Sequence, residues 1–202
     1  MRNRETEVKI RIPSAPALRT RLRKLGFVAI HRKAFEDNVL YDTPERALRQ
    51  VRAILRVRRY GTTWLVTYKG TPQMDPHYKS RMELESKVER PEVITAIFQS
   101  LGLVPVFRYQ KYRAQYVLPG TKARGKPAFE LALDETPIGD FMELEWSRKT
   151  IDRIARALGY SRSDYSTASY GALYREDCAR KGIPPSDMVF ASGARRKGGA
   201  TR

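Results

Sequence analysis

The amino-terminal segment alternates charged and uncharged residues. Glu5, Glu7 and Lys9 are separated by Thr6 and Val8. In a β-strand, this period of two places the three charged side chains on one face. The same spacing recurs as acidic pairs at Glu83 and Glu85 and at Glu143 and Glu145, and as basic pairs at Arg56 and Arg58 and at Lys111 and Arg113. Carboxylates bind divalent cations and arginines bind phosphate, so a sheet that gathers both on one face indicates a site for metal ions and a polyanion.

A simpler interpretation exists for each strand alone, because one face of an antiparallel sheet is often solvated and charged. Taken together, the strands sort acids from bases, which a solvated face has no reason to do. If the sheet closes into a barrel, the charged faces line its interior. That interior would contain Glu5, Glu7, Lys9, Arg56, Arg58, Lys69, Arg81, Glu83, Glu85, Lys111, Arg113, Glu130, Asp134, Glu143 and Glu145.

So many enclosed charges require compensation, because an unpaired buried charge is costly. Divalent cations would compensate the carboxylates, and a polyphosphate would compensate the arginines and lysines. Oxygen ligands without His or Cys favour Mg²⁺ or Mn²⁺ over zinc. His31 and His77 have no second histidine or carboxylate at metal-ligand spacing, so we interpret both as structural.

The composition fits an anionic partner. The 202 residues include 39 Lys and Arg against 22 Asp and Glu, a formal net charge of +17. A nucleotide, a polyphosphate, a nucleic acid or an acidic surface would each suit this charge. Cys178 is the single cysteine, the start of the chain is charged, and no apolar run reaches the roughly 20 residues of a membrane span. We therefore expect a cytoplasmic protein with no disulfide and no membrane partner.

The order of elements predicts an internal repeat. Short helices are expected at 18–25, 94–101 and 151–158, each followed by glycine. The segments after the first two helices, 25–41 and 101–117, have similar patterns. Paired strands are expected at 53–60 with 63–69 and at 129–134 with 141–146. The predicted fold class is α+β, mainly β and antiparallel, with a two-fold internal repeat.

We expect one domain over residues 1–178. The tail over 179–202 is basic, with Pro184-Pro185 followed by small and basic residues, a composition that cannot bury a core, so we expect it to be disordered.

Six motifs occur in an order typical of one family. They are Glu5, Glu7 and Lys9; Leu55-Arg56-Val57-Arg58; Thr67-Tyr68-Lys69-Gly70; Lys79, Arg81, Glu83 and Glu85; Lys111 and Arg113; and Asp134, Gly139, Phe141, Glu143 and Glu145. Over about residues 3–175, the chain resembles the CYTH superfamily, also called triphosphate tunnel metalloenzymes. That family includes class IV adenylate cyclases, thiamine triphosphatases and inorganic triphosphatases, and the chain most resembles the bacterial proteins grouped with the cyclases.

The resemblance implies a closed tunnel of eight antiparallel strands with helices outside, and two bound Mg²⁺ or Mn²⁺ ions. By analogy it also implies a homodimer. Residues implied as metal ligands are Glu5, Glu7, Glu143 and Glu145, with Glu83, Glu85 and Asp134 in or near the metal shell. Residues implied in triphosphate binding are Lys9, Arg56, Arg58, Lys69, Arg81, Lys111 and Arg113. Catalytic roles are implied for Lys9 and Lys69, with Tyr41 as the tyrosine that pairs with Lys69 to activate water.

Three functions remain open from the sequence. The first, which the overall resemblance favours, is the conversion of ATP to cyclic AMP and pyrophosphate. The second is hydrolysis of tripolyphosphate, thiamine triphosphate or a nucleoside triphosphate; the run Phe35-Glu36-Asp37-Asn38 departs from the Asp-x-Tyr strand common in the cyclases. The third is a non-catalytic binder of polyphosphate or nucleic acid, although such a binder has no use for paired glutamates without metal ions.

Overall fold

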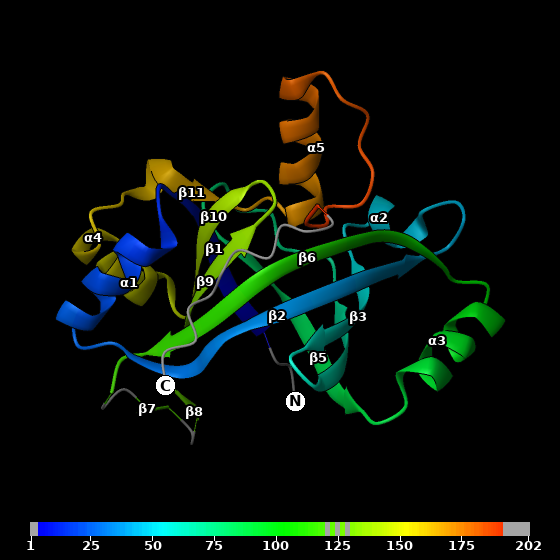
Figure 1. Cartoon of the computed structure of the whole chain (residues 1–202), viewed down its shortest axis with the longest axis horizontal. Coiled ribbons are helices and arrows are strands. Elements are labelled where there is room, and N and C mark those ends of the chain that lie inside the picture. The colour runs from blue at the N-terminus through cyan, green and yellow to red at the C-terminus, as the bar shows by residue number, and fades with distance from the viewer. Residues whose placement is uncertain (1–3, 120–121, 124–125, 128–129, 192–202) are drawn as a thin grey trace.

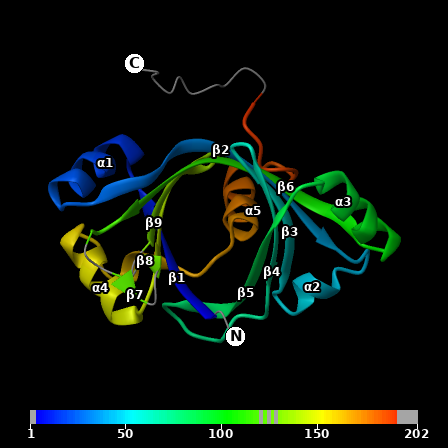
Figure 2. The ribbon, with the colours of Figure 1, turned by 90° about the horizontal axis from the view of Figure 1, so that it is seen from below.

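Eight strands form a closed antiparallel barrel in the computed structural model, which describes residues 4–119, 122–123, 126–127 and 130–191. The order around the ring is β1, β5, β4, β3, β2, β6, β9, β10, and β10 pairs back with β1. Figure 2 looks into this ring. The strands are β1 (Arg4–Ile12), β2 (Val28–Asp42), β3 (Ile54–Tyr60), β4 (Thr63–Lys69), β5 (Lys79–Val88), β6 (Val104–Val117), β9 (Glu130–Thr136) and β10 (Gly139–Glu145).

The expected two-fold repeat is confirmed by the strand pairing. The first half runs β1, α1, β2, β3, β4, and the second runs β5, α3, β6, β9, β10. Each half pairs its own second, third and fourth strands in order, and the fourth strand pairs with the first strand of the other half. The two halves also meet where β1 pairs with β5 and where the long strands β2 and β6 lie side by side (Figure 1).

The three expected helices are present, and each begins three residues before its predicted start. They are α1 (Ala15–Lys24), α3 (Pro91–Ser100) and α4 (Arg148–Ala157). The Ser14 hydroxyl caps α1 by accepting a hydrogen bond from the Ala17 amide. The smaller elements are α2 (Ala47–Gln50), β7 (Lys122–Ala123), β8 (Lys126–Pro127), a 3₁₀ turn at Arg162–Asp164, β11 (Tyr165–Ser166) and α5 (Tyr170–Lys181), and the sequence did not predict α2 or α5.

The hydrophobic core lies outside the barrel, between its wall and two helices. Leu18 and Leu22 of α1 pack with Ile151, Ile154 and Leu158 of α4. Figure 2 shows both helices on the same side of the ring. The strand residues that complete this cluster include Val8, Ile10, Leu131, Leu133, Met142 and Leu144. Because these apolar residues alternate with the charged ones, packing the helices outside turns the charges into the barrel.

The chain after α5 returns to the barrel. Met188 is fully buried, and its backbone pairs with the edge of β6 beside Tyr109. The Met188 amide donates to the carbonyl of Arg108 at 3.0 Å, and the Gln110 amide donates to the carbonyl of Met188 at 2.9 Å. Of the expected tail over 179–202, residues 179–181 form the end of α5 and residues 182–191 are also described, whereas 192–202 lie outside the described residues. Within the described chain, no helix is long and apolar enough to cross a membrane.

The outer core predicts a difference between two leucines of α1. Leu22 has no exposed surface, and Leu25 at the end of the helix is 41% exposed. Leu22→Ala should lower the free energy of unfolding by about 2–5 kcal/mol, because it leaves a cavity between α1 and α4. Leu25→Ala should cost less than about 1 kcal/mol. Urea unfolding followed by circular dichroism would measure both, and equal losses would contradict this placement of the core.

Candidate active site in the barrel

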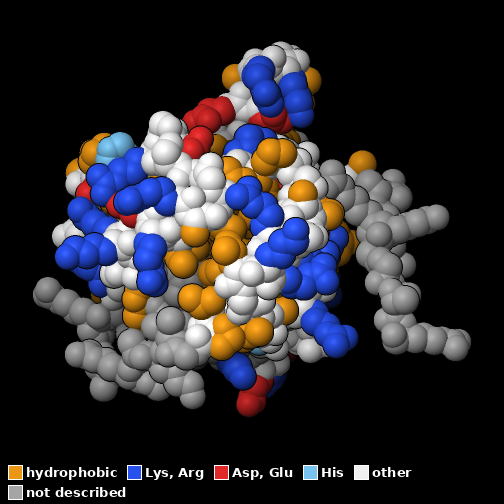
Figure 3. All heavy atoms as spheres, turned by 90° about the vertical axis from the view of Figure 1, so that its left-hand side faces the viewer, with side chains coloured by type: hydrophobic (Ala, Val, Ile, Leu, Met, Phe, Trp, Pro, Cys, Tyr) orange, Lys and Arg blue, Asp and Glu red, His pale blue; other side chains and the backbone are white. Residues whose placement is uncertain are grey.

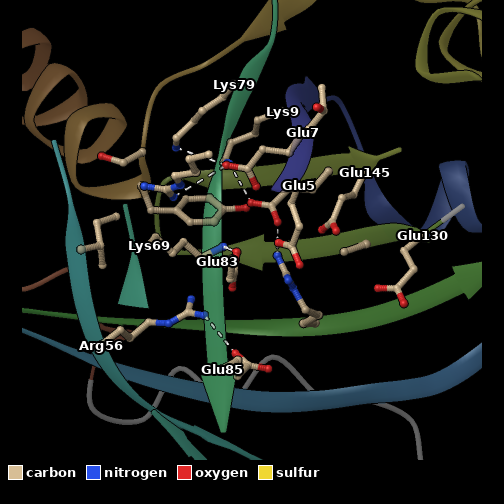
Figure 4. A pocket seen from close by; sticks show the side chains of 18 of the residues that line it. Glu5, Glu7, Lys9, Arg56, Lys69, Lys79, Glu83, Glu85, Glu130 and Glu145 are labelled. Carbon is tan, nitrogen blue, oxygen red and sulfur yellow. Dashed lines mark hydrogen bonds and ion pairs between the residues drawn. The ribbon is translucent and has the colours of Figure 1, made fainter. Parts of the chain in front are cut away.

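The barrel encloses a cavity of about 940 Å³ to which all eight strands contribute. The described residues that line it include nine cationic side chains and seven carboxylates. Every site residue predicted from the sequence lines this cavity except Tyr41 and Asp134. The cavity also has wall residues to which the sequence analysis gave no role, among them Lys79, Tyr109 and Tyr170. Figure 4 shows Lys79, Lys69 and Arg56 on one side and Glu5, Glu145 and Glu130 on the other.

Two carboxylates on the acidic side have raised pKa values. Burial, a hydrogen bond shared with Glu83 and the charge of Glu145 raise the pKa of Glu5 to about 9. Burial and the charges of Glu7 and Glu130 raise the pKa of Glu145 to about 8. Among the described residues, neither Glu5 nor Glu145 forms an ion pair with a base. Both carboxyl groups therefore hold protons near neutral pH unless another cation replaces them.

This donor set fits a divalent cation. The available donors are carboxylate oxygens, the ligands that Mg²⁺ and Mn²⁺ prefer. No group of three or more acidic, His or Cys side chains in the described chain is already close enough to hold a metal ion. Mg²⁺ commonly binds through one or two carboxylates and takes water and substrate phosphate as its other ligands. Glu5 and Glu145 are the residues best placed to hold such an ion.

The other predicted metal ligands have basic partners. Glu7 Oε1 lies 3.2 Å from Lys79 Nζ and 3.9 Å from Arg81 Nη2. Although burial opposes ionisation, Lys79, Lys69 and Lys9 together lower the pKa of Glu7. Glu83 pairs with Lys69, and Glu85 accepts hydrogen bonds at 2.8 Å from Arg58 Nη2 and from the Thr67 hydroxyl. Burial lowers the pKa of Lys79 to about 8, although the negative charge of Glu7 acts in the opposite direction.

Arg56 contributes to the basic side from β3. Its Nη1 donates to the Tyr109 hydroxyl at 3.0 Å, and its Nη2 donates to Thr67 Oγ1 at 3.2 Å. The Nε atoms of Arg56 and Arg58 are buried without a hydrogen-bond partner. Because an unsatisfied buried donor costs free energy, these two N–H groups mark a place for an acceptor such as a phosphate oxygen.

A buried charge network fixes the cations of β6. Asp134 has no exposed surface and accepts hydrogen bonds from Lys111 Nζ at 3.0 Å and from the Tyr170 hydroxyl at 2.6 Å. Arg113 donates to both oxygens of Asp134, at 2.7 Å from Nε and 2.6 Å from Nη2, and also pairs with Glu143. The structure thus surrounds Asp134 with cations and a phenol, not with other carboxylates.

The sequence analysis missed Glu36, which joins this buried charge network but is not among the described residues that line the cavity. This β2 side chain is fully buried, with Lys111 Nζ at 3.6 Å, Arg58 at 3.7 Å and Arg113 at 3.9 Å. Burial opposes ionisation, but those cations lower the pKa of Glu36 to about 2. Its neighbour Asp37 is also acidic, so the period of two does not stand out in this strand.

Lys9 lies at the base of the cavity. Its ammonium is 2.7 Å from Glu143 Oε1 and 4.5 Å from the centre of the Tyr170 ring. Burial alone would lower the pKa of Lys9, but the charges of Glu143 and Glu7 outweigh it and raise that pKa. Lys111 approaches the same ring at 4.9 Å. Tyr170, the first residue of α5, therefore connects the helix to the floor of the site.

Tyr41 and Lys69 are not brought together. Leu40 lines the cavity, and Tyr41, the next residue of β2, points to the opposite face. The Tyr41 ring packs edge-on against Phe98 of α3, with the ring centres 5.3 Å apart. The catalytic role of Tyr41 therefore stays a prediction that no contact in the described chain supports.

The sequence of this charge-lined barrel matches the model of the CYTH domain over residues 3–170. The chain belongs to the CYTH domain family. A curated relative from Methanocaldococcus jannaschii, named "Putative adenylate cyclase", is 31% identical over 177 residues. That match covers 82% of this chain and 95% of the relative.

Two solved structures share the CYTH fold of this chain. A "putative adenylate cyclase" from Vibrio parahaemolyticus superposes with a TM-score of 0.71 at 19% identity, covering 84% of this chain and 97% of that one. A Hippeastrum protein superposes with a TM-score of 0.58 at 19% identity, covering 90% and 97%. It is described as a "putative adenylyl cyclase" with a dominant triphosphatase activity.

The raised pKa of Glu145 predicts a pH dependence of stability. The folded chain keeps this proton up to about pH 8, whereas the unfolded chain loses it near the ordinary value of 4.5. The folded state thus binds more protons between these values, so this group lowers the free energy of unfolding as pH rises, by at most about 1.4 kcal/mol per pH unit.

Glu145→Gln should remove this contribution, so the variant gains stability relative to the wild type between about pH 5 and pH 8. Urea unfolding of both proteins across this range, in the presence of a chelator, would measure the change. Any constant cost of the substitution drops out of the comparison. A difference that does not vary with pH would contradict the account.

Proposed function

We propose that this CYTH protein is a divalent-metal-dependent enzyme that binds a triphosphate group in its barrel and cleaves one of its P–O bonds. One observation carries the proposal: among the described residues, nine cationic side chains line a cavity in which Glu5 and Glu145 form no ion pair with a base. A polyphosphate matches the first set, and divalent cations match the second.

The residues of the chain would act mainly by position and charge. Arg56, Arg58 and Arg81 would bind phosphate oxygens, and the unpartnered Nε groups of the first two are free to donate. Lys9, Lys69 and Lys111 would add positive charge where the leaving phosphate becomes more negative. Glu5 and Glu145 would hold a divalent cation, which when bound polarises the phosphoryl group under attack. The pairs that hold Arg113 and Lys111 to Asp134 would keep the cradle rigid.

Two different nucleophiles could attack a triphosphate bound in this cavity. The name of the 31% identical relative supports a cyclase, in which the ribose hydroxyl of ATP attacks the α-phosphorus and pyrophosphate leaves. The Hippeastrum protein supports a triphosphatase, in which water attacks the terminal phosphorus. One observation favours the second: a second cavity that adjoins the barrel cavity is lined by arginines that a neutral nucleoside does not require.

Binding of nucleic acid without catalysis is a weaker candidate. Figure 3 shows that Lys and Arg side chains dominate the face that carries α1 and α4. Arg21, Arg23 and Lys24 of α1 are exposed there. Binding of this kind would leave the acidic side of the barrel without a purpose. The cytoplasmic location and the homodimer expected from the sequence remain proposals.

The decisive assay identifies the products. Purified protein would be incubated with ATP, tripolyphosphate and thiamine triphosphate in separate tubes with Mg²⁺ or Mn²⁺, and phosphorus NMR would resolve the products. Pyrophosphate with cyclic AMP would establish a cyclase, and orthophosphate release would establish a triphosphatase. Absence of turnover in every tube by correctly folded protein would contradict the enzyme proposal.

Glu5→Gln should reduce turnover by about 100-fold, since it removes a metal-binding carboxylate. Because Glu5 has no basic partner, this variant leaves no cation unpaired, unlike a change at Glu143. Glu89→Gln makes the same chemical change on the exposed part of the chain and should retain full turnover. Equal activity of both variants would remove Glu5 from the mechanism.

A further inference from the structure

A second cavity of about 830 Å³ adjoins one end of the barrel. It lies among α2, α5 and the chain that follows β4, and we name it the vestibule. Leu40, Ile54, Lys79 and Arg81 line both the vestibule and the barrel cavity. A ligand held in the barrel can therefore extend into the vestibule without leaving the protein surface.

Besides Lys79 and Arg81, which it shares with the barrel cavity, the vestibule is lined by four described arginines: Arg46, Arg49, Arg52 and Arg175. In the part of the chain that the structure describes, none of these four arginines forms an ion pair. Glu45 and Glu176, the sequence neighbours of Arg46 and Arg175, do not come within ion-pair distance of them. The side chain of Arg52 instead donates to Met74 Sδ at 3.3 Å.

Asp42 is the single carboxylate among the described wall residues of the vestibule, and it is already engaged. Its oxygens accept backbone hydrogen bonds from Thr43 at 2.8 Å, Leu48 at 2.8 Å and Arg49 at 2.9 Å. These bonds hold α2 in place. The positive charge of the vestibule is therefore not balanced by the protein itself.

The backbone around α2 adopts an uncommon conformation. Arg46 has φ = 64° and Arg52 has φ = 59°, and both are in the left-handed region that favours glycine. Such residues cost free energy and persist where the surrounding structure fixes them, often at binding sites. Arg175 of α5 lines the vestibule together with Arg49 of this segment. Burial and the charge of Arg49 lower the pKa of Arg175. The arginines are thus gathered from two elements.

We propose that the vestibule binds the further phosphates of a linear inorganic polyphosphate whose terminal triphosphate lies in the barrel. This inference rests on the triphosphate site proposed above and extends its substrate class to chains longer than three phosphates. Each added phosphate brings negative charge to unpaired guanidinium groups, which bind phosphate in a planar, two-point manner. A neutral nucleoside would leave these groups unpaired. Phe107 and Tyr174, two aromatic residues that line the vestibule, pack against each other with their ring centres 6.1 Å apart.

The test compares ligands of different length on one matched pair of variants. Isothermal titration calorimetry would measure the binding of tripolyphosphate, ATP and a size-fractionated longer polyphosphate to the full chain with Ca²⁺. The vestibule variant is Arg49→Gln with Arg175→Gln. The control is Arg23→Gln with Arg153→Gln, two exposed arginines of α1 and α4 that carry the same loss of charge.

The vestibule variant should bind the longer polyphosphate about tenfold more weakly, since each partly exposed arginine–phosphate contact is worth about threefold. Its affinity for tripolyphosphate should stay within about twofold, and the control should match the wild type for every ligand. Circular dichroism would establish that both variants fold.

Equal weakening of tripolyphosphate and longer polyphosphate, or equal weakening in the control, would overturn the inference. Selective weakening of ATP would overturn it in favour of a nucleotide site. If the wild-type chain bound tripolyphosphate but gained nothing from a longer ligand, the inference would fail and the proposed function would stand. Absence of tripolyphosphate binding to the wild type would contradict the proposed function itself.

Discussion

The neutralisation of charge inside a closed sheet is the constraint on which this structure depends. A barrel has no free edge, and its inward side chains cannot turn away to bulk water. The bases of this barrel are therefore tied to carboxylates, as Arg113 and Lys111 are to Asp134 and Lys9 is to Glu143. We assign the proposed function to the exceptions in the described chain: Glu5 and Glu145, whose pKa values are raised, and the two guanidinium Nε groups that lack acceptors.

The cost of this interior is offset outside it. Charged and apolar residues alternate in β1 from Glu7 to Ile12, so Val8 and Ile10 pack beneath α1 and α4 while Glu7 and Lys9 face the cavity. The stability of the fold thus comes mainly from the outer core, where buried apolar area is the dominant favourable term. This separation lets the interior keep unsatisfied groups without loss of the fold. Each half of the two-fold repeat supplies four of the eight strands of the barrel.

The sequence predicted the parts of the site that follow from a period of two. The period of two in the first strand and in the motif that ends at Glu85 correctly predicted that the charged side chains of these strands lie inside the barrel. The glycines that follow three helices located the ends of those helices. The same rule failed at Glu36, because Asp37 beside it is also acidic and the inward face was ambiguous. Tyr41 was paired with Lys69 by family resemblance, whereas its place in β2 turns it towards Phe98.

The ion pairs and hydrogen bonds across the barrel could not be predicted, because they depend on the relative positions in the barrel of strands that are distant in sequence. Tyr170 reaches Asp134 only after α5 has been positioned at the end of the barrel. For the same reason, the sequence analysis could not tell which of the seven acidic residues assigned to metal binding have basic partners, and it grouped Glu7 and Glu143 with Glu5 and Glu145 as direct ligands. The structure separates them, since Glu5 and Glu145 lack basic partners and the others have them.

The most direct test of the central claim is to count the protons released when Mn²⁺ binds to the full chain near neutral pH. Titration calorimetry in buffers of different ionisation enthalpy gives this number. If the unpartnered carboxyl groups of Glu5 and Glu145 bind the metal, about two protons should be released in the wild type and about one in Glu145→Gln. Binding of Mn²⁺ without proton release, or with equal release in both proteins, would contradict the account.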